Sequence, residues 1–275
     1  MSASNWIEKL LKEIPLERLS KNDRRKFSEF IRKEYEKEIS HPPKIAIIGP
    51  TGVGKSSTIN ALFGTSLPVS HTKAETSSPV QISINREGQL VKGAKGDLLL
   101  YDMPGIGEDL EKDEKYKELY RQVISTCDVA VWIVSAPDRQ IAHDLAVIRD
   151  VVRPANEQLV SRLVIGVNKV DLIHPNNWDS VSNLPSKEQE LNLRERFKDI
   201  KARLLKVCPG LTEDRIVGYS AIRRYRLLQL FGAMLKACPD ERAWVLNSKQ
   251  QIDDYWELVA PELRKQVPVF AKGAR

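Results

Sequence analysis

Six short apolar runs rich in β-branched residues restrict the fold of this 275-residue chain more than any other feature. Stretches long enough for a helix separate most of them, and continuous apolar runs are typical of strands that a parallel sheet buries on both faces. The predicted strands are residues 45–48, 80–84, 98–101, 129–134, 163–167 and 216–219. The sequence therefore predicts an α/β fold with a six-stranded, mostly parallel sheet and helices on both faces.

The connections between these strands divide into one hairpin and several crossovers. Residues 85–88 have turn composition and predict an antiparallel hairpin between the second and third strands. The other connections are long enough for helices, which are expected to begin near Lys55, Asp113, Ile141, Glu188 and Arg224.

Two helical flanks are predicted on either side of this central unit. Apolar residues recur at helical spacing before His41 and after Pro239, and Pro42 and Pro43 break the first pattern. We therefore predict an N-terminal helical segment (1–43), a central domain (44–238) and a C-terminal helical segment (239–275). Each flank is too short to bury a core alone, so we expect both to pack against each other or against the central domain.

Charge and composition argue against several classes of protein. The 43 Lys and Arg residues exceed the 37 Asp and Glu residues by only six charges, which does not favour a nucleic-acid partner. The flanks mix acids with bases, which disfavours binding to a membrane surface. The longest apolar run, residues 129–134, is far shorter than the roughly 20 residues that cross a bilayer. Three widely spaced cysteines fit reduced thiols, and a cytoplasmic location is expected.

Residues 49–56 read GPTGVGKS, directly after a predicted strand and before a predicted helix. This GxxxxGKS pattern is a P-loop, whose glycines let backbone N–H groups surround phosphate oxygens at a helix N-terminus. Lys55 adds a positive charge near the β- and γ-phosphates, and the Ser56 hydroxyl is suited to bind Mg²⁺. The predicted phosphate-binding residues are Gly49, Thr51, Gly52, Val53, Gly54, Lys55, Ser56 and Ser57.

A second motif, DMPG, follows the third predicted strand at residues 102–105. An aspartate at this strand end can hold the water shell of Mg²⁺, which is the role predicted for Asp102. The N–H group of Gly105 can then contact a γ-phosphate.

A third and a fourth motif, NKVD at residues 168–171 and SA at residues 220–221, select the base. Guanine presents two N–H donors along one edge, which the Asp171 carboxylate can accept, whereas adenine would leave that carboxylate unpaired. The aliphatic stem of Lys169 can cover the base, and Asn168 can tie its loop to the P-loop. Ser220 and Ala221 would complete the pocket, with a backbone N–H group directed at guanine O6. The ligands predicted are therefore GTP and GDP with Mg²⁺.

The order of these four motifs resembles the GTP-binding domain of the translation-factor-related GTPases, in their Era and TrmE branch. Within that branch, GKSSTINALFG and NKVDLIHPNNWDSVSNLPSKEQELN resemble the bacterial Era-like GTPases often carried by prophages, which are similar to the immunity-related GTPases of animals. The resemblance covers about residues 44–238. It implies a threonine that closes over Mg²⁺ and the γ-phosphate when GTP is bound, with Thr76 as first choice and Thr72 as second.

Two departures from related GTPases predict slow hydrolysis. Ile106 follows Gly105, where Ras-like GTPases have a glutamine that orients water, and Gly52 stands where the potassium-activated members have an asparagine. The residues expected to act on the phosphates are then Lys55, Thr76 and Gly105. We predict a Mg²⁺-dependent GTPase switch that receives catalytic help from a second copy or a protein partner.

Two other functions stay open at this stage. One is a GTP-gated scaffold that dimerises or assembles, and the other is a GTPase associated with the ribosome or with RNA. Arg223, Arg224 and Arg226 form the densest basic cluster, which is interpreted as a charged helix start with RNA, lipid or a neighbouring subunit as alternatives. Trp178 is interpreted as an anchor for the long loop that follows the NKVD motif.

Overall fold

The computed structural model describes residues 42–69, 78–84, 90–91, 98–106, 110–139 and 141–239, together with a few residues between positions 20 and 29. The predicted flanks, residues 1–43 and 239–275, lie almost entirely outside this described part. Their helices and their packing therefore stay predictions.

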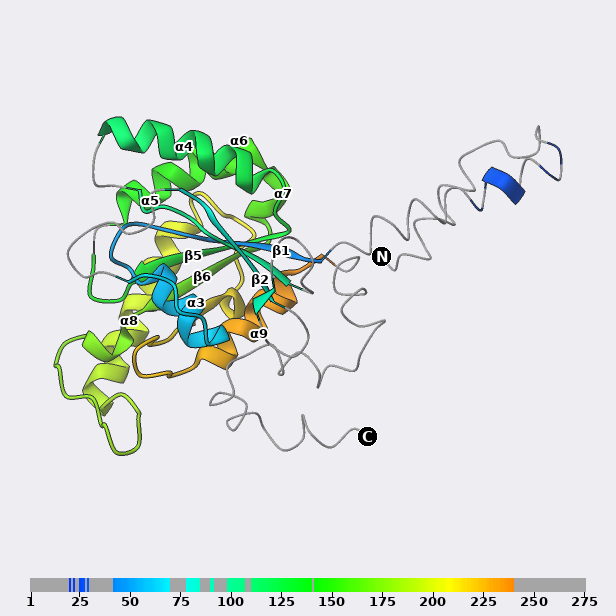
Figure 1. Cartoon of the computed structure of the whole chain (residues 1–275). Helices are drawn as coiled ribbons and strands as arrows, with labels where there is room; N and C mark the ends of the chain where they lie inside the picture. Colours follow the sequence, from blue (N-terminus) through cyan, green and yellow to red (C-terminus); the bar gives the residue numbers. More distant parts are fainter. Residues whose placement is uncertain are drawn as a thin grey trace, which may run out of the picture.

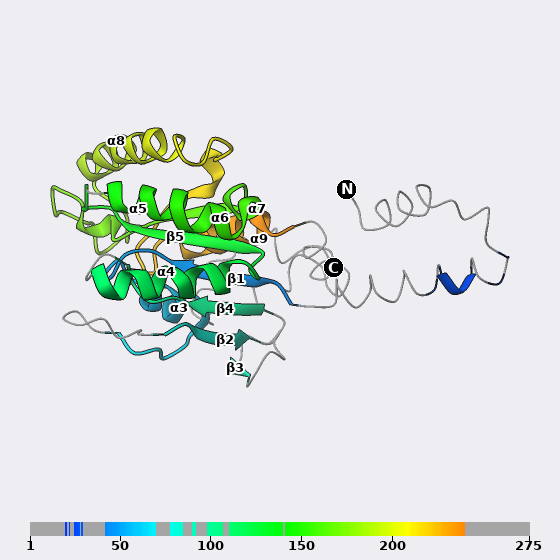
Figure 2. The ribbon, with the colours of Figure 1, turned by 90° about the horizontal axis from the view of Figure 1, so that it is seen from above.

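A seven-stranded sheet forms the centre of the molecule, with the strand order β3-β2-β4-β1-β5-β6-β7. Its strands are β1 (Lys44–Ile48), β2 (Val80–Ile84), β3 (Leu90–Val91), β4 (Leu98–Asp102), β5 (Val129–Ser135), β6 (Leu163–Asn168) and β7 (Ile216–Gly218). The five strands from β4 to β7 in this order are parallel, whereas β2 runs antiparallel to both β4 and β3. Figure 2 shows the succession from β3 to β5.

One strand, β3, was not predicted. Its two residues pair with Ser83 and Ile84 of β2 and extend the sheet at that edge. Two residues are too few to show an alternating pattern, so the sequence carried no signal for this strand. The predicted antiparallel pairing of the second and third strands is confirmed as the β2–β4 pair. The predicted direct hairpin between them is wrong, because β3 lies in the chain between β2 and β4 and pairs with the other edge of β2. The turn at residues 85–88, between β2 and β3, lies outside the described residues.

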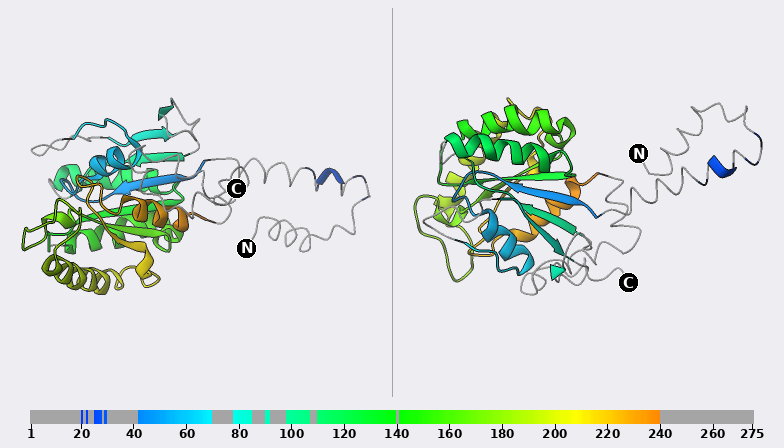
Figure 3. Two further views of the ribbon diagram at one scale, coloured as in Figure 1. Left: turned by 90° about the horizontal axis from the view of Figure 1, so that it is seen from below. Right: turned by 45° about the horizontal axis from the view of Figure 1, so that its top comes forward.

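Helices cover both faces of the sheet, as predicted, and Figures 1 and 3 show this layered arrangement. The longer helices are α3 (Lys55–Phe63), α4 (Leu110–Ile124), α8 (Lys187–Leu204) and α9 (Leu227–Ala237). The shorter elements are α5 (Ala142–Val147), η2 (Ile148–Val152), α6 (Arg153–Ala155), α7 (Glu157–Val160), η3 (Val170–Leu172) and η4 (Glu213–Arg215). Among the described helices, none combines the length and the apolar composition needed to cross a membrane.

Two hydrophobic cores hold these layers together. On one face α3 and α9 pack against the sheet, and the rings of Phe63 and Phe231 meet edge to face with their centroids 5.7 Å apart. On the other face α4, η2, α7 and α8 bury the large side chains Tyr120 and Trp132 together with aliphatic residues of β1, β5 and β6. Every residue of β6 is buried, which is why its apolar run gave such a clear strand signal.

The strand register brings the predicted motifs to one edge of the sheet. Ile47 of β1 pairs with Asp102 of β4, and Ser135 of β5 pairs with Asn168 of β6. The P-loop, the DMPG motif, the NKVD motif and the SA motif each follow one of the parallel strands β1, β4, β6 and β7. Since the carboxyl ends of parallel strands share an edge, four segments far apart in sequence become neighbours.

The buried Asp144 of α5 makes the stability of the fold depend on pH. Asp144 accepts a 2.7 Å hydrogen bond from Nε1 of Trp132, and desolvation raises the pKa of its carboxyl from 3.8 to about 6. Between these two values the folded chain keeps a proton that the unfolded chain has lost, so the free energy of unfolding falls as pH rises through that window. The loss is on the order of 3 kcal/mol once the pH exceeds about 6.

We predict that Asp144→Asn stabilises the protein at pH 7 but not at pH 4, because the neutral amide can still accept from Trp132 and carries no desolvated charge. Urea unfolding of the variant and of the wild type at both pH values measures this difference. Asp214→Asn is the matched control, because it removes an exposed carboxylate whose pKa the Thr212 side chain holds below its ordinary value. This control should not stabilise the protein at pH 7. An equal effect of Asp144→Asn at both pH values would contradict the prediction.

Candidate functional site

The P-loop follows β1 without any intervening residue and turns directly into α3. Gly49 has φ of +140°, and a Cβ atom there would lie 2.3 Å from the carbonyl oxygen of Ile133 in the neighbouring strand. No other residue type fits at this point, because the loop must pass so close to the β5 backbone. Gly54 then caps α3 in the left-handed conformation. The loop therefore turns with the start of α3 directed at the carboxyl edge of the sheet.

Lys55 lies across the P-loop. Its Nζ donates hydrogen bonds to the carbonyl oxygens of Gly49 at 3.1 Å and Pro50 at 2.8 Å. The side chain is buried although it carries a charge, and its carbonyl partners offset the cost of that burial. The predicted phosphate-binding ammonium is thus held inside the loop that it is expected to serve.

Three contacts join the P-loop to the DMPG segment. The Ser56 hydroxyl donates a 2.6 Å hydrogen bond to Oδ2 of the buried Asp102, so two of the three residues predicted at Mg²⁺ lie side by side. Pro50 forms a parallel bridge with Ile106. A Cβ atom on Gly105 would come within 2.0 Å of Thr51 Oγ1, so this close approach requires glycine. Among the described residues, Thr51 Oγ1 is buried and has no hydrogen-bond partner.

Asn168, at the end of β6, connects three loops through one side chain. Its Nδ2 donates to the carbonyl oxygen of Val53 in the P-loop at 2.8 Å. Its Oδ1 accepts from the N–H of Lys169 at 2.8 Å and from the N–H of Ala221 at 3.1 Å. The expected tie between the NKVD loop and the P-loop is therefore present, and the SA loop joins the same amide.

Lys169 and Asp171 extend from this junction in different directions. Lys169 adopts a left-handed backbone conformation with φ of 61°, and its Nζ donates to the carbonyl oxygen of Gly52 at 2.6 Å. Its stem therefore spans the space between the two loops. The Asp171 carboxylate is buried and has the guanidinium of Arg223 at 3.8 Å. The sequence places both residues in one motif, and the fold separates their side chains.

The SA loop is a tight turn, closed by two backbone hydrogen bonds between Ser220 and Tyr225. The Ser220 hydroxyl accepts from the N–H of Arg223 at 3.1 Å, which shapes the turn from inside. The N–H of Ala221, expected to contact guanine O6, donates to Asn168 Oδ1 in this structure. Its contact with a base stays a prediction.

Several residues around the site carried no recognised signal in the sequence. The buried Tyr120 of α4 donates through its hydroxyl to the carbonyl oxygen of Pro104 at 2.8 Å and accepts from the N–H of Gly49 at 3.5 Å. Gln189 of α8 donates to the carbonyl oxygens of Asp171 at 3.3 Å and Ile173 at 3.0 Å. A Ser-x-x-Gln capping box at the start of α8 could have indicated Gln189, whereas Tyr120 sits in an ordinary amphipathic helix.

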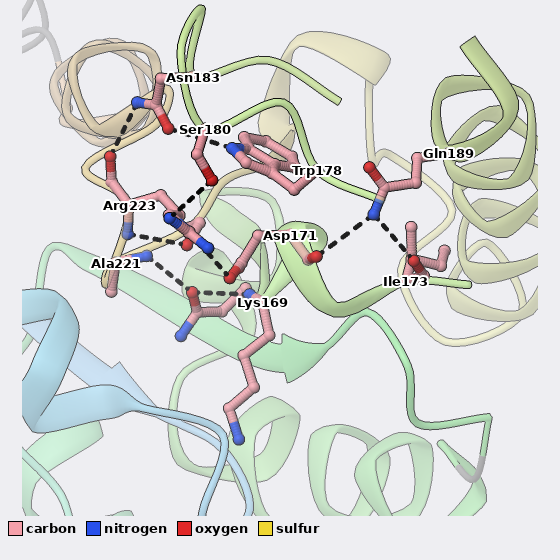
Figure 4. Close-up of polar contacts among 11 residues, drawn as sticks. Lys169, Asp171, Ile173, Trp178, Ser180, Asn183, Gln189, Ala221 and Arg223 are labelled. Carbon is pink, nitrogen blue, oxygen red and sulfur yellow. Dashed lines mark hydrogen bonds and ion pairs between the residues drawn. The ribbon is translucent and has the colours of Figure 1, made fainter. Parts of the chain in front are cut away.

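The loop of residues 173–186 packs beside the SA turn, as Figure 4 shows. The rings of Trp178 and Tyr225 meet edge to face with centroids 5.1 Å apart, and Asn183 donates to the carbonyl oxygen of Arg223 at 2.9 Å. Trp178 therefore does anchor the loop, as its interpretation from sequence proposed. The predicted threonines Thr76 and Thr72 lie outside the described residues, so their roles stay predictions.

Comparisons with known proteins agree with this arrangement. Residues 44–169 match the model of a family described as 50S ribosome-binding GTPase. The uncharacterized protein YfjP of Escherichia coli K12 is 31% identical over 171 residues, which are 62% of this chain and 55% of YfjP. GTPase Der of Chloroherpeton thalassium is 31% identical over 185 residues, which are 65% of this chain and 38% of Der. The chain thus spans about half or less of the length of these curated relatives.

Among solved structures, Era of Aquifex aeolicus bound to GDP and aluminium tetrafluoride is similar in fold. The TM-score is 0.54 at 24% identity, over 72% of this chain and 57% of Era. This likeness supports the fold alone, whereas the family match covers β1, the P-loop, the DMPG segment and the start of the NKVD motif. Together with the four motifs at one sheet edge, the comparisons lead to one conclusion: the central part of this chain has the fold and the motifs of a P-loop GTPase, and it is similar to the GTPases Era and Der.

Proposed function

We propose that this chain binds GTP together with Mg²⁺ and hydrolyses it slowly to GDP and phosphate, as a nucleotide-controlled switch. The observation that carries the proposal is the Asn168 side chain, which joins the P-loop, the NKVD loop and the SA loop through three hydrogen bonds. One ligand that spans all three loops needs phosphates at one end and a base at the other. A purine nucleoside triphosphate has this shape.

Guanine is the base that the Asp171 carboxylate fits best. A buried carboxylate accepts hydrogen bonds only, so it suits the N1–H and 2-amino donors of guanine and is left unpaired opposite adenine. The stem of Lys169 lies between its loop and the P-loop, where it can cover one face of the base. The cost of an unpaired buried carboxylate is what separates GTP from ATP in this proposal.

The phosphate end of the site fits a Mg²⁺ ion. Ser56 and Asp102 supply the hard oxygen donors that this ion prefers, and they already lie in contact at the end of β4. Thr51 Oγ1 is buried in the same region and has no hydrogen-bond partner within the described part of the chain, which supports a polar ligand there. When bound, Mg²⁺ neutralises part of the charge on the phosphate oxygens.

Hydrolysis needs water to attack the γ-phosphorus while the bond to the β–γ bridging oxygen breaks. GDP leaves with that oxygen, and the water proton passes to the released phosphate. Lys55 and the backbone N–H groups of the P-loop would stabilise the charge that develops on the transferred group. The N–H of Gly105, which packs on Thr51, would contact the γ-phosphate.

Slow turnover follows from the residue after Gly105. Ile106 is buried in the hydrophobic core and pairs with Pro50, so it offers no polar atom to orient water. The switch would consist of residues 64–79, with Thr76 as ligand of Mg²⁺ and the γ-phosphate, and residues 105–112. Two described contacts support this choice: Val80, which follows the first segment, pairs with Asp102, and Ile106 of the second segment pairs with Pro50 of the P-loop.

Lys55→Ala is expected to weaken GTP binding about a hundredfold, because a charge-assisted contact to phosphate is lost from a buried position. Isothermal titration calorimetry with GTP and Mg²⁺ measures the effect. Lys206→Ala, which removes an exposed lysine after α8, is the matched control and should bind as the wild type does. Undiminished affinity in Lys55→Ala would refute the phosphate assignment.

Asp171→Asn is expected to change the preferred base from guanine to xanthine. The amide donates where the carboxylate accepted, and xanthine carries a carbonyl oxygen where guanine carries the amino group. We expect about a hundredfold loss of GTP affinity and a gain for xanthosine triphosphate. Competition titrations with both nucleotides test this exchange. Retained preference for GTP would remove Asp171 from the site.

A second candidate function is GTP-gated self-association, which a group of exposed apolar side chains beside the base loops supports. Val181 is 98% exposed, Ile222 is 73% exposed and Leu184 is 50% exposed. The contact between Asn183 and Arg223 holds their two loops together, so the three exposed residues lie on neighbouring loops, and we call them the apolar rim. A second copy that covers this rim could also supply the catalytic group that Ile106 does not.

We predict that the apolar rim promotes association in the presence of a non-hydrolysable GTP analogue. Sedimentation velocity with the analogue and with GDP, and turnover measured across protein concentrations, are the two measurements. Val181→Asp should abolish both the larger species and the rise in specific activity, while Leu191→Asp, at an exposed leucine of α8, should not. One monomeric species with both nucleotides would rule out this second function.

A further inference from the structure

The guanidinium of Arg223 lies between the Asp171 carboxylate and the loop of residues 173–186, as Figure 4 shows. Its Nε is 3.8 Å from Asp171 Oδ2, and one of its terminal nitrogens donates to the Ser180 hydroxyl at 3.4 Å. The Asp171 side chain is 7% exposed and that of Arg223 is 42% exposed. The arginine thus covers the solvent side of a nearly buried carboxylate.

The backbone of Arg223 is fixed on both sides. Its N–H donates to the Ser220 hydroxyl at 3.1 Å, and its carbonyl oxygen accepts from Nδ2 of Asn183 at 2.9 Å. The first contact belongs to the SA turn and the second to the loop of residues 173–186. Because both ends of the residue are held, the guanidinium starts from a defined position.

The backbone of Asp171 is fixed in a similar way from the other side. Its carbonyl oxygen accepts from Nε2 of the buried Gln189, which also forms the capping box of α8 with Ser186. Gln189 therefore holds the main chain of Asp171, and Arg223 faces its side chain. Gln189 and Arg223 both contact the loop of residues 173–186: Gln189 donates to the carbonyl oxygen of Ile173, and Arg223 donates to the Ser180 hydroxyl.

A carboxylate that recognises guanine must present both oxygens to one edge of the base. The distance of 3.8 Å is longer than a hydrogen bond, so Arg223 attracts Asp171 Oδ2 without taking up its acceptor capacity. Charge attraction of this kind restricts the rotation of the carboxylate and leaves its lone pairs to a ligand. Arg223 is thus suited to orient the Asp171 carboxylate without occupying the acceptor sites that a base would use.

We propose that Arg223 is a positioning residue for guanine selection, and that the loop of residues 173–186 acts on base specificity through it. This inference rests on the proposed function, since it assumes that Asp171 reads the base. Arg224 is exposed in the same turn and provides an internal comparison.

The test uses the full chain with GTP and with inosine triphosphate, which lacks the 2-amino group, and the wild type is also titrated with ATP. The ratio of GTP affinity to inosine triphosphate affinity reports the bond between that amino group and the carboxylate. Arg223→Gln is expected to lower the ratio about threefold to fivefold, the range of a partly exposed charge contact. Arg223→Lys, which keeps the charge, should retain part of the ratio, and Arg224→Gln should leave it unchanged. Ser180→Ala, which frees the guanidinium from the loop, should lower it less than Arg223→Gln.

The outcomes separate the positioning role from a structural one. A lower ratio in Arg223→Gln with unchanged thermal unfolding supports the inference. An unchanged ratio, an equal loss for both nucleotides, or tighter GTP binding in Arg223→Gln would each overturn it. Equal binding of GTP and ATP by the wild type would instead overturn the proposed function, and this inference with it.

Discussion

The hydrogen bonds of the Asn168 amide are the interaction on which the rest of the site depends. An amide has both donors and an acceptor with two lone pairs, so one side chain can bind a carbonyl oxygen in one loop and N–H groups in two others. The Asn168 amide forms one hydrogen bond with each of three loops: the P-loop, its own loop and the SA turn. Its burial strengthens these bonds, because water does not compete for them.

The parallel sheet makes such a junction possible. Strands β1, β4, β6 and β7 end at the same edge of the sheet. Each motif begins at the end of its strand or within two residues of it. The close approaches at Gly49 and Gly105 bring backbone against backbone or side chain where any larger residue would clash. The site is therefore assembled from short loops on a rigid frame, which favours a fixed geometry before any ligand binds.

The two ends of the site are supported by different means. At the base end, the loop of residues 173–186, the start of α8 and the SA turn surround Asp171 with polar and aromatic contacts. At the phosphate end, the DMPG segment touches the P-loop through Ser56, Thr51 and Pro50. In the proposed function, this division would separate the choice of nucleotide from its hydrolysis, so that a change at the phosphate end would leave the choice of base intact.

The sequence by itself determined the fold class, the order of the four motifs and the chemistry of their residues, because each motif is local and its spacing encodes a loop at a strand end. The sequence did not predict the two-residue strand β3, because so short a strand leaves no periodic pattern. Only the tertiary structure decided which residues hold the motifs in place. Arg223 beside Asp171, Gln189 beneath it and Tyr120 against Pro104 are contacts between distant parts of the chain. Such contacts depend on how helices and loops pack, and no local spacing of residues specifies that packing.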